Sequence, residues 1–280
     1  MRASFSAPPE FPEFPEFPEV FERFAESVDT AQVTTLLLGF TGFDGPAAAT
    51  HLVKAAERFP RLRALRLGGW NEDFYNIQQS DLTPVLELFP LLEHLEVRGK
   101  QGWELRPFHH AALKTLRFES CGLPADVVRA VAAADLPALE RLELWIGVSN
   151  DETDLADAPD LAPILSGERL PTLLHLGLEN SAIQDEMAEL LASAPVVARL
   201  RSLNLAMGTL TDRGAESLLD GRPLTHLERL DLHHHYLSDR MMERLRAAYA
   251  TTEVDLGDDM GEDHGPFDEV YNRVADGRDF

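Results

Sequence analysis

Leu113 to Leu123 read L-K-T-L-R-F-E-S-C-G-L, and this stretch decides the fold of the chain. Leu116 and Phe118 are two residues apart, so their side chains share a face only in an extended strand. Arg117, which stands between them, then points to the opposite face. After Phe118 the chain turns, and Cys121 points back under the strand. A unit of this kind has an apolar face that it cannot bury alone, so several units must stack to share one core.

The same two-residue step between apolar residues recurs at intervals of 21 to 34 residues along the chain. Unrelated amphipathic helices would not keep that step at every recurrence. Return helices are predicted near 46–59, 81–90, 123–135, 184–193, 212–219 and 239–250, and an acidic loop over 149–160. Alternating strand and helix predicts an α/β solenoid with parallel strands on its concave face and helices on its convex face. The apolar pairs are Leu36/Leu38, Leu65/Leu67, Leu95/Val97, Leu116/Phe118, Leu142/Leu144, Leu176/Leu178, Leu203/Leu205, Leu230/Leu232 and Val254/Leu256.

The spacing L-x-x-L-x-L-x-x-C-x-L at 113–123 resembles the leucine-rich repeat, and the length of the units resembles the ribonuclease-inhibitor-like type. Two runs, S-L-N-L-A-M-G-T-L-T-D-R-G-A-E-S-L-L at 202–219 and R-L-D-L-H-H-H-Y-L-S-D at 229–239, are similar to an uncharacterised bacterial family found mainly in actinobacteria. The resemblance implies a horseshoe-shaped leucine-rich-repeat solenoid and a protein-binding role. It implies no catalytic residues.

The chain divides into one repeat domain and two flanking segments. Residues 1–19 contain a tandem Phe-Pro-Glu repeat, whose prolines block helix and central strand, so a disordered arm is predicted. The alternative is that its phenylalanines dock on the first repeat or on another protein. The solenoid is expected over 20–257, with a capping helix at 20–28, and an acidic tail over 258–280.

Composition narrows the class of partner and the compartment. The net charge is −23, with 48 acidic against 25 basic residues, which argues against nucleic acid and an anionic membrane surface as partners. No apolar stretch is long enough for a transmembrane helix, and the N-terminus has no apolar segment typical of a secretory signal. Cys121 is the single cysteine, so a cytoplasmic location is expected.

The predicted concave face displays the residue between each apolar pair (the fifth repeat position) and the residue after it (the seventh). Alternating signs on neighbouring strands allow two interpretations: cross-strand ion pairs that satisfy one another, or a polar groove with exposed tryptophans as anchors. We expect the groove to bind a protein or peptide, with a basic segment facing its acidic C-terminal half. The residues predicted to bind are Arg66, Trp70, Glu96, Arg98, Arg117, Glu119, Glu143, Trp145, Glu179, Asn204, Asp231 and His233.

Three features suggest chemistry, and none fits a known motif well. His233–His235 with Asp231 and Asp255 suggests a metal, but adjacent histidines in a strand point to opposite faces. The acidic run 255–263 does not have the spacing of a calcium-binding loop. Cys121 occupies a repeat position where a buried, inert thiol is expected. The sequence therefore predicts no enzyme and no cofactor. The alternative is a metal-dependent enzyme or accessory subunit that uses the histidine cluster and the acidic tail, and the oligomeric state is left open.

Overall fold

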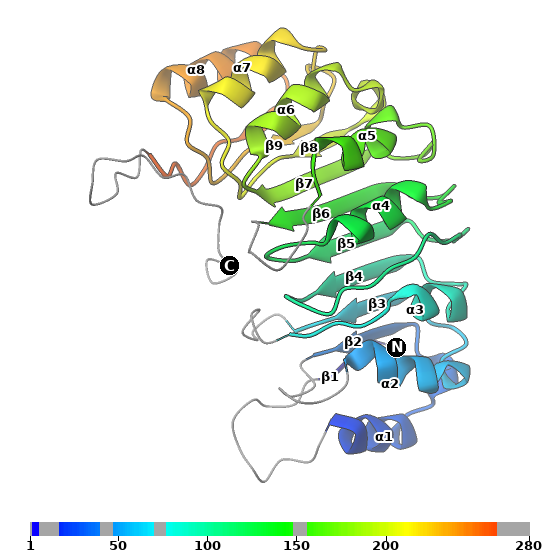
Figure 1. The fold of residues 1–280 in the computed structure, drawn as a ribbon. Helices are drawn as coiled ribbons and strands as arrows, with labels where there is room; N and C mark the ends of the chain where they lie inside the picture. Colours follow the sequence, from blue (N-terminus) through cyan, green and yellow to red (C-terminus); the bar gives the residue numbers. More distant parts are fainter. Residues whose placement is uncertain (1, 6–16, 40–46, 70–76, 148–155, 262–280) are drawn as a thin grey trace.

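A computed structural model describes residues 2–5, 17–39, 47–69, 77–147 and 156–261. These residues form an α/β fold with an open, ten-stranded parallel sheet in which the order of the strands follows the order of the chain (Figure 1). The strands are β1 (Arg2–Phe5), β2 (Thr35–Leu38), β3 (Ala64–Leu67), β4 (His94–Arg98), β5 (Thr115–Glu119), β6 (Arg141–Gly147), β7 (His175–Ser181), β8 (Ser202–Asn204), β9 (Arg229–Asp231) and β10 (Glu253–Asp255).

Eight α-helices occur in the described part of the chain, and Figure 1 shows most of them in a row along one side of the sheet. This arrangement is consistent with a solenoid. The helices are α1 (Phe17–Ser27), α2 (Ala48–Lys54), α3 (Thr83–Leu88), α4 (Ala125–Ala133), α5 (Ala158–Ser166), α6 (Gln184–Ser193), α7 (Asp212–Asp220) and α8 (Asp239–Ala248), with shorter 3-10 turns at Thr30–Gln32, Ala56–Arg58 and Pro195–Arg199.

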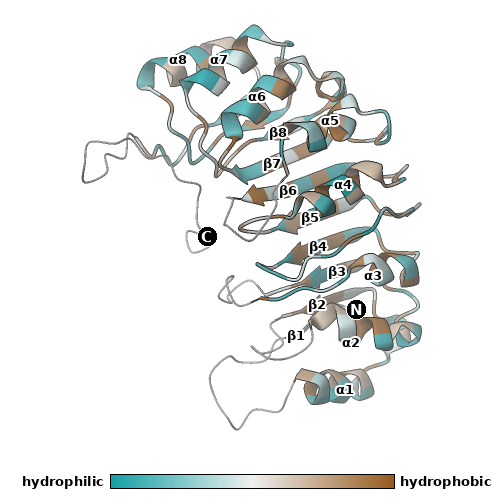
Figure 2. Ribbon diagram, in the orientation of Figure 1, coloured by the Kyte–Doolittle hydropathy of each residue, from teal (hydrophilic) through white to brown (hydrophobic). Residues whose placement is uncertain are grey.

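The core is a ladder of leucines that runs from strand to strand. Leu65 pairs in register with Leu95, Leu95 with Leu116, and Leu116 with Leu142, and all of these side chains are buried. The second apolar residue of each pair from Leu38 to Leu232 is buried in the same layer, between the sheet and the helices, and Leu256 of the last pair is partly buried. Figure 2 shows hydrophobic residues along the strands and many hydrophilic residues in the later helices. The strand positions predicted from the leucine pairs are confirmed.

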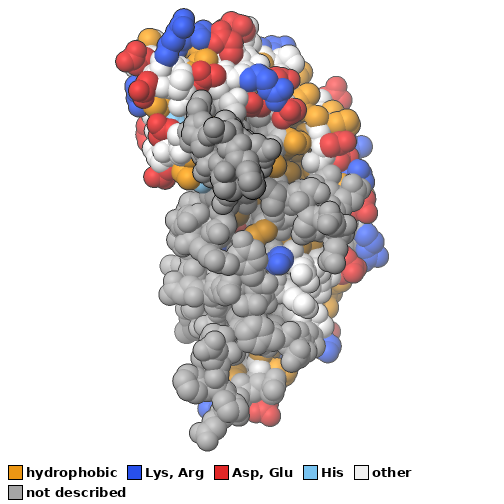
Figure 3. Space-filling model, turned by 60° about the vertical axis from the view of Figure 1, so that its left-hand side comes forward, with side chains coloured by type: hydrophobic (Ala, Val, Ile, Leu, Met, Phe, Trp, Pro, Cys, Tyr) orange, Lys and Arg blue, Asp and Glu red, His pale blue; other side chains and the backbone are white. Residues whose placement is uncertain are grey.

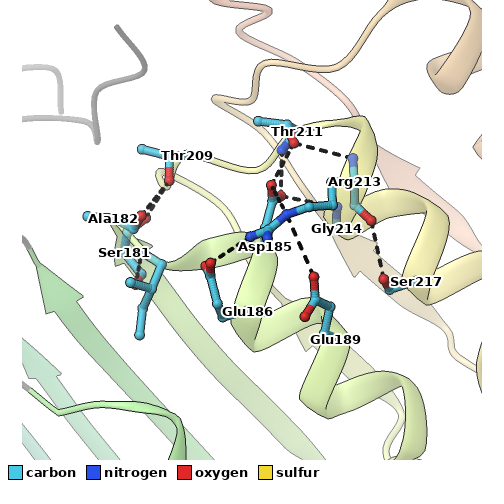
Figure 4. Close-up of polar contacts among 11 residues, drawn as sticks. Ser181, Ala182, Asp185, Glu186, Glu189, Thr209, Thr211, Arg213, Gly214 and Ser217 are labelled. Atoms are coloured by element: carbon cyan, nitrogen blue, oxygen red, sulfur yellow. Dashed lines mark hydrogen bonds and ion pairs between the residues drawn. The ribbon is translucent and has the colours of Figure 1, made fainter.

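Aspartates tie the last helices together at their N-termini, and Figure 4 shows the first of these links, around Asp185. Asp185 in α6 accepts hydrogen bonds from the backbone N–H of Thr211 at 2.8 Å, from its hydroxyl at 2.6 Å, and from Nε of Arg213 at 3.2 Å. Asp212 in α7 does the same for Ser238, at 2.8 Å to its backbone N–H and 2.7 Å to its hydroxyl. Each carboxylate thus accepts hydrogen bonds at the start of the next helix. Its negative charge also interacts favourably with the positive end of that helix dipole.

Ion pairs add to these links on the helical side. Arg213 also contacts Glu186 at 2.6 Å, and Arg244 in α8 pairs with Glu216 in α7. Figure 3 shows acidic and basic side chains intermingled at the end of the molecule that carries these helices. The net negative charge is therefore partly compensated by local pairing there.

Three boundaries differ from the sequence-based expectation. Residues 2–5 form β1, parallel to β2, and α1 begins at Phe17, so a disordered arm over 1–19 is wrong for these residues; residues 6–16 lie outside the described part. The predicted acidic loop contains the start of α5, because Asp157 and Asp160 form a capping box there. Asp259 bridges to His235, so the residues expected to begin the acidic tail still pair with the repeats, and 262–280 lie outside the description.

No helix in the described ranges combines the length and the apolar character that crossing a bilayer requires.

Candidate functional site

The candidate site is the sheet face opposite the helices, which we call the open face. The fifth and seventh repeat positions of β3 to β9 project from it, because they alternate with the buried leucines. The strand register places Arg66, Glu96, Arg117, Glu143, Gly177, Asn204 and Asp231 in one row across the sheet. The fifth-position residues predicted from the sequence therefore do lie side by side.

In the N-terminal half of the open face the charges pair with one another. Arg66 binds Glu96 on the next strand, and its second guanidinium nitrogen lies 3.8 Å from Glu119. Nε of Arg98 lies 3.7 Å from the same Glu119 oxygen. Arg66, Arg98 and Glu119 are buried, each no more than 6 % exposed, so these ions depend on one another for stabilisation.

Arg117 continues the network toward the middle of the sheet. Its Nε donates to Glu119 at 2.7 Å and its Nη1 to Glu143 at 2.6 Å, while Arg141 donates to the other oxygen of Glu143 at 2.9 Å. Burial lowers the pKa of Arg117, but the neighbouring carboxylates of Glu119 and Glu143 outweigh it and raise that pKa. The alternation of sign seen in the sequence therefore produces cross-strand ion pairs. This was the first of the two interpretations of the charged row.

The expectation of an exposed tryptophan anchor at Trp145 is wrong, because its side chain is only 5 % exposed. Ala206 and Met207, which follow β8, pack against the ring. The Arg117 guanidinium carbon lies 5.9 Å from the ring centroid, a cation–π distance. Residues that follow a later strand therefore cover this seventh-position side chain.

Glu179 is the most unusual residue of the open face. It is 2 % exposed; its Oε2 accepts a 3.3 Å hydrogen bond from Trp145 Nε1, and its Oε1 has no hydrogen-bond partner. Burial raises the pKa of Glu179 to about 8, with repulsion from Glu143 and Asp231 adding to the effect and Arg117 opposing it. The carboxyl is therefore mostly protonated at neutral pH.

A small pocket of about 180 Å³ lies on the open face between β6 and β9. Three of the predicted binding residues, Glu143, Asn204 and Asp231, line it. The pocket is also lined by Arg141 and Arg229, which were not among the predicted binding residues; both occupy the third repeat position, on the same face as the fifth. Ser202, Leu176 and Leu203 complete the lining.

A second, larger pocket of about 380 Å³ lies on the same face of β2 to β4. Arg66 and Glu96 line it together with His94 and the apolar side of Leu37. Its two charged groups, Arg66 and Glu96, are paired with each other, and most of its other lining residues are apolar.

Asp231, His233 and Asp255 bring three candidate metal-ligand atoms within 4.8 Å of one another. Nδ1 of His233 is hydrogen-bonded to Asp231 at 2.7 Å, which raises the pKa of His233. Arg229 already bridges the two carboxylates, at 2.9 Å to Asp231 and 3.1 Å to Asp255. The same space therefore holds either this guanidinium or a cation in its place.

The other two histidines of the run do not join that group. His235 is fully buried, and its Nδ1 accepts a hydrogen bond from the backbone N–H of Leu237 at 3.2 Å, while His234 has a left-handed backbone with φ of 57°. The three adjacent histidines thus occupy three different environments. Of the remaining predicted residues, Trp70 lies outside the described part of the chain.

Comparison with known proteins finds a solved structure of similar fold and gives no information on function. No protein-family model matches the chain, and no curated protein matches it. The chain is similar to a Bacteroides fragilis protein whose crystal structure comes from a structural-genomics consortium, with 28 % identity, a TM-score of 0.76, and coverage of 86 % of this chain and 73 % of that one. A leucine-rich-repeat protein of Leptospira interrogans aligns with 16 % identity over 80 % of this chain and 72 % of that one, but its TM-score of 0.24 carries no argument. Neither likeness supports the resemblance to an actinobacterial family.

Proposed function

We propose that this chain is a leucine-rich-repeat solenoid that binds a protein or peptide on its open face and has no catalytic activity of its own. The observation that carries the proposal is the one-sided arrangement of the sheet. Helices cover one face, whereas no described helix or strand covers the other, where polar and charged residues stand in register. Repeat folds commonly use such an extended face for recognition.

The distribution of charge within the open face supports a partner-binding site in the C-terminal half of that face. In the N-terminal half each arginine contacts a glutamate and the buried Glu119 has cationic partners, whereas Glu179 on β7 forms no ion pair in the described part of the chain. The pocket between β6 and β9 is lined by two carboxylates, those of Glu143 and Asp231, and by the amide of Asn204, with Arg141 and Arg229 beside them. A partner segment carrying a basic side chain matches this lining. The single cysteine agrees with a cytoplasmic setting for such a protein.

Capture from cell lysate tests the proposal. Asn204→Arg places a bulky cation in the pocket at the cost of one hydrogen bond, which the backbone N–H of Ala206 donates to Oδ1 of Asn204. Ala247→Arg adds the same charge on the exposed surface of α8 and serves as the matched control. We expect Asn204→Arg to lose the captured protein and Ala247→Arg to retain it. Thermal unfolding checks that both variants are folded, since the lost hydrogen bond shifts Tm by only about 2–4 °C in a chain of this size.

Retention of the same protein by Asn204→Arg, with both variants folded, would contradict the location on the open face. An effect of Ala247→Arg equal to that of Asn204→Arg would point to general charge and not to the pocket.

The alternative function, a metal-dependent enzyme or accessory subunit, is favoured by one observation: the convergence of Asp231, His233 and Asp255. Two carboxylates and an imidazole are ligands that zinc accepts. Arg229 opposes it, because a metal would have to displace a guanidinium held by both carboxylates. Elemental analysis of protein purified without a histidine tag decides between the two, and stoichiometric metal that is lost in Asp255→Asn would favour the alternative.

A further inference from the structure

The row of side chains across the open face is interrupted at Gly177. This glycine pairs in register with Glu143 on one side and Asn204 on the other, and it supplies no side chain between them. A Cβ added at Gly177 would overlap Oε1 of Glu179 and lie 3.1 Å from Cγ of Glu143. The Glu179 carboxyl therefore folds back along its own strand and occupies the place that a fifth-position side chain would fill.

This placement puts an unsatisfied oxygen in the row between Glu143 and Asn204, two residues that line the pocket. Glu143 and Asn204, the neighbours of Gly177 in the row, both line the pocket, and Asp231 lies one strand further on. Oε1 of Glu179 has no partner, although a buried acceptor without a hydrogen bond costs about 1–3 kcal/mol. Such a group in a folded protein calls for an explanation, and a donor that arrives with a ligand is one.

The basic groups nearby are already engaged. Arg141 donates to Glu143, Arg229 to Asp231, and Arg117 to both Glu119 and Glu143. Glu179 forms no ion pair with any of them in the described part of the chain. Around the pocket, the carboxyl without a cation is therefore that of Glu179.

We propose that the pocket beside Gly177 binds the ammonium group of one lysine side chain of the partner, between Glu143, Glu179 and Asn204. This inference rests on the proposed function, and it names the chemistry that the open face recognises. A lysine ammonium has three donors and no acceptor, which matches two carboxyl groups and an amide oxygen. The volume of about 180 Å³ equals the space of about six water molecules, enough for one long side chain and smaller than the ~300 Å³ of a typical small-molecule site.

Binding of the ammonium is coupled to the release of a proton from Glu179. The groups that face this carboxyl are Trp145, Arg117, Glu143 and Asp231, and it is mostly protonated at neutral pH because of burial. A positive charge beside Oε1 favours the ionised carboxylate, so the proton leaves to solvent as lysine binds. The affinity should then rise with pH below the pKa of about 8, by as much as tenfold per unit.

An NMR titration of the full chain tests this inference with two probes. The first is the acetylated pentapeptide Gly-Gly-Lys-Gly-Gly amide, and the second carries norleucine, which lacks the charge, in place of lysine. The indole N–H of Trp145 donates to Glu179 and reports on its ionisation. We expect the lysine peptide, and not the norleucine peptide, to shift this signal, with at least a fivefold gain in affinity between pH 6.5 and pH 7.5.

Two variants locate the effect. Glu179→Gln keeps the shape of the protonated side chain and removes its titration, so binding of the lysine peptide should weaken and lose its pH dependence. Glu243→Gln removes one carboxylate from the exposed surface of α8 and should leave binding unchanged. Gly177→Ala should also weaken binding, because its methyl group displaces the Glu179 carboxyl. Should Gly177→Ala fail to fold, Glu179→Gln alone decides.

Equal binding of both peptides, no binding of the lysine peptide at pH 8.5, or an unchanged affinity in Glu179→Gln would overturn the inference. The proposed function has a separate outcome. If Glu179→Gln still captures the lysate protein while Asn204→Arg does not, the open face binds a partner without this lysine contact. If Asn204→Arg captures it as the native chain does, the proposed function itself fails.

Discussion

Glu179→Gln is expected to stabilise the folded chain at neutral pH and to leave its stability nearly unchanged in mild acid. The ordinary pKa of this carboxyl is 4.5, and burial raises it to about 8 in the folded chain. Below pH 4.5 the group is protonated in both the folded and the unfolded chain, so it makes no difference to stability. Between pH 4.5 and pH 8 the unfolded chain loses the proton and the folded chain keeps it, so stability falls as pH rises.

The size of the effect follows from the two pKa values. Each unit of pH in this window costs about 1.4 kcal/mol, and neutral pH lies about 2.5 units above the unfolded value, which gives a penalty of about 3 kcal/mol. Glutamine carries no such penalty. The free energy of unfolding of Glu179→Gln should therefore exceed that of the native chain by about 3 kcal/mol at pH 7.

Urea denaturation at pH 4.5 and pH 7 measures this difference. The other titrating groups are shared by the two chains and cancel in the comparison. Glu243→Gln, at an exposed position on α8, is the control and should show the same small difference at both pH values. If Glu179→Gln differs from the native chain by the same amount at both pH values, Glu179 is not held protonated and the electrostatic reasoning fails.

Three further predictions concern the scaffold. Leu142→Ala should destabilise the fold by about 2–5 kcal/mol in urea denaturation, because its side chain is fully buried in the leucine ladder; a loss below about 1 kcal/mol would mean that the ladder does not form. Gly147→Ala should cost more than about 2 kcal/mol, since φ is 83° and the new methyl group would overlap the carbonyl of Cys121, whereas Gly261→Ala, with φ of 62° and open space around it, should cost less. Asp185→Ala should lower the free energy of unfolding by about 2 kcal/mol or more through the donors it leaves unpaired near Thr211, and an unchanged Tm would show that this link is not needed.

Much of the scaffold could be predicted because its signal is local. Two leucines separated by one residue specify an extended segment, and this step located the strands from β2 to β10. β1 was missed because R-A-S-F contains no such pair, and its position depends on β2, which lies 30 residues further along the chain. The start of α5 was missed because the acidic run 149–160 suggested a loop, whereas the Asp157 capping box starts a helix there.

The site was harder to predict because the ion pairing and burial of its side chains depend on contacts between different repeats. The sequence showed which side chains share the open face, and the alternating signs of Arg66, Glu96, Arg117 and Glu143 led to ion pairs that the structure contains. Burial at the seventh position could not be read from the strand itself. It depends on turns from other units, such as Ala206 packing on Trp145.

The two sides of the lysine pocket are built from strands of unequal length. β6 and β7 each have seven residues, whereas β8 and β9 have three, so fewer backbone hydrogen bonds anchor the wall that carries Asn204 and Asp231. Local opening tends to be easiest where such bonds are few. If the open face binds a partner as proposed, the β8–β9 wall should yield more easily than the β6–β7 wall, so the pocket could widen for a bulkier residue while the carboxyl group of Glu179 stays in place.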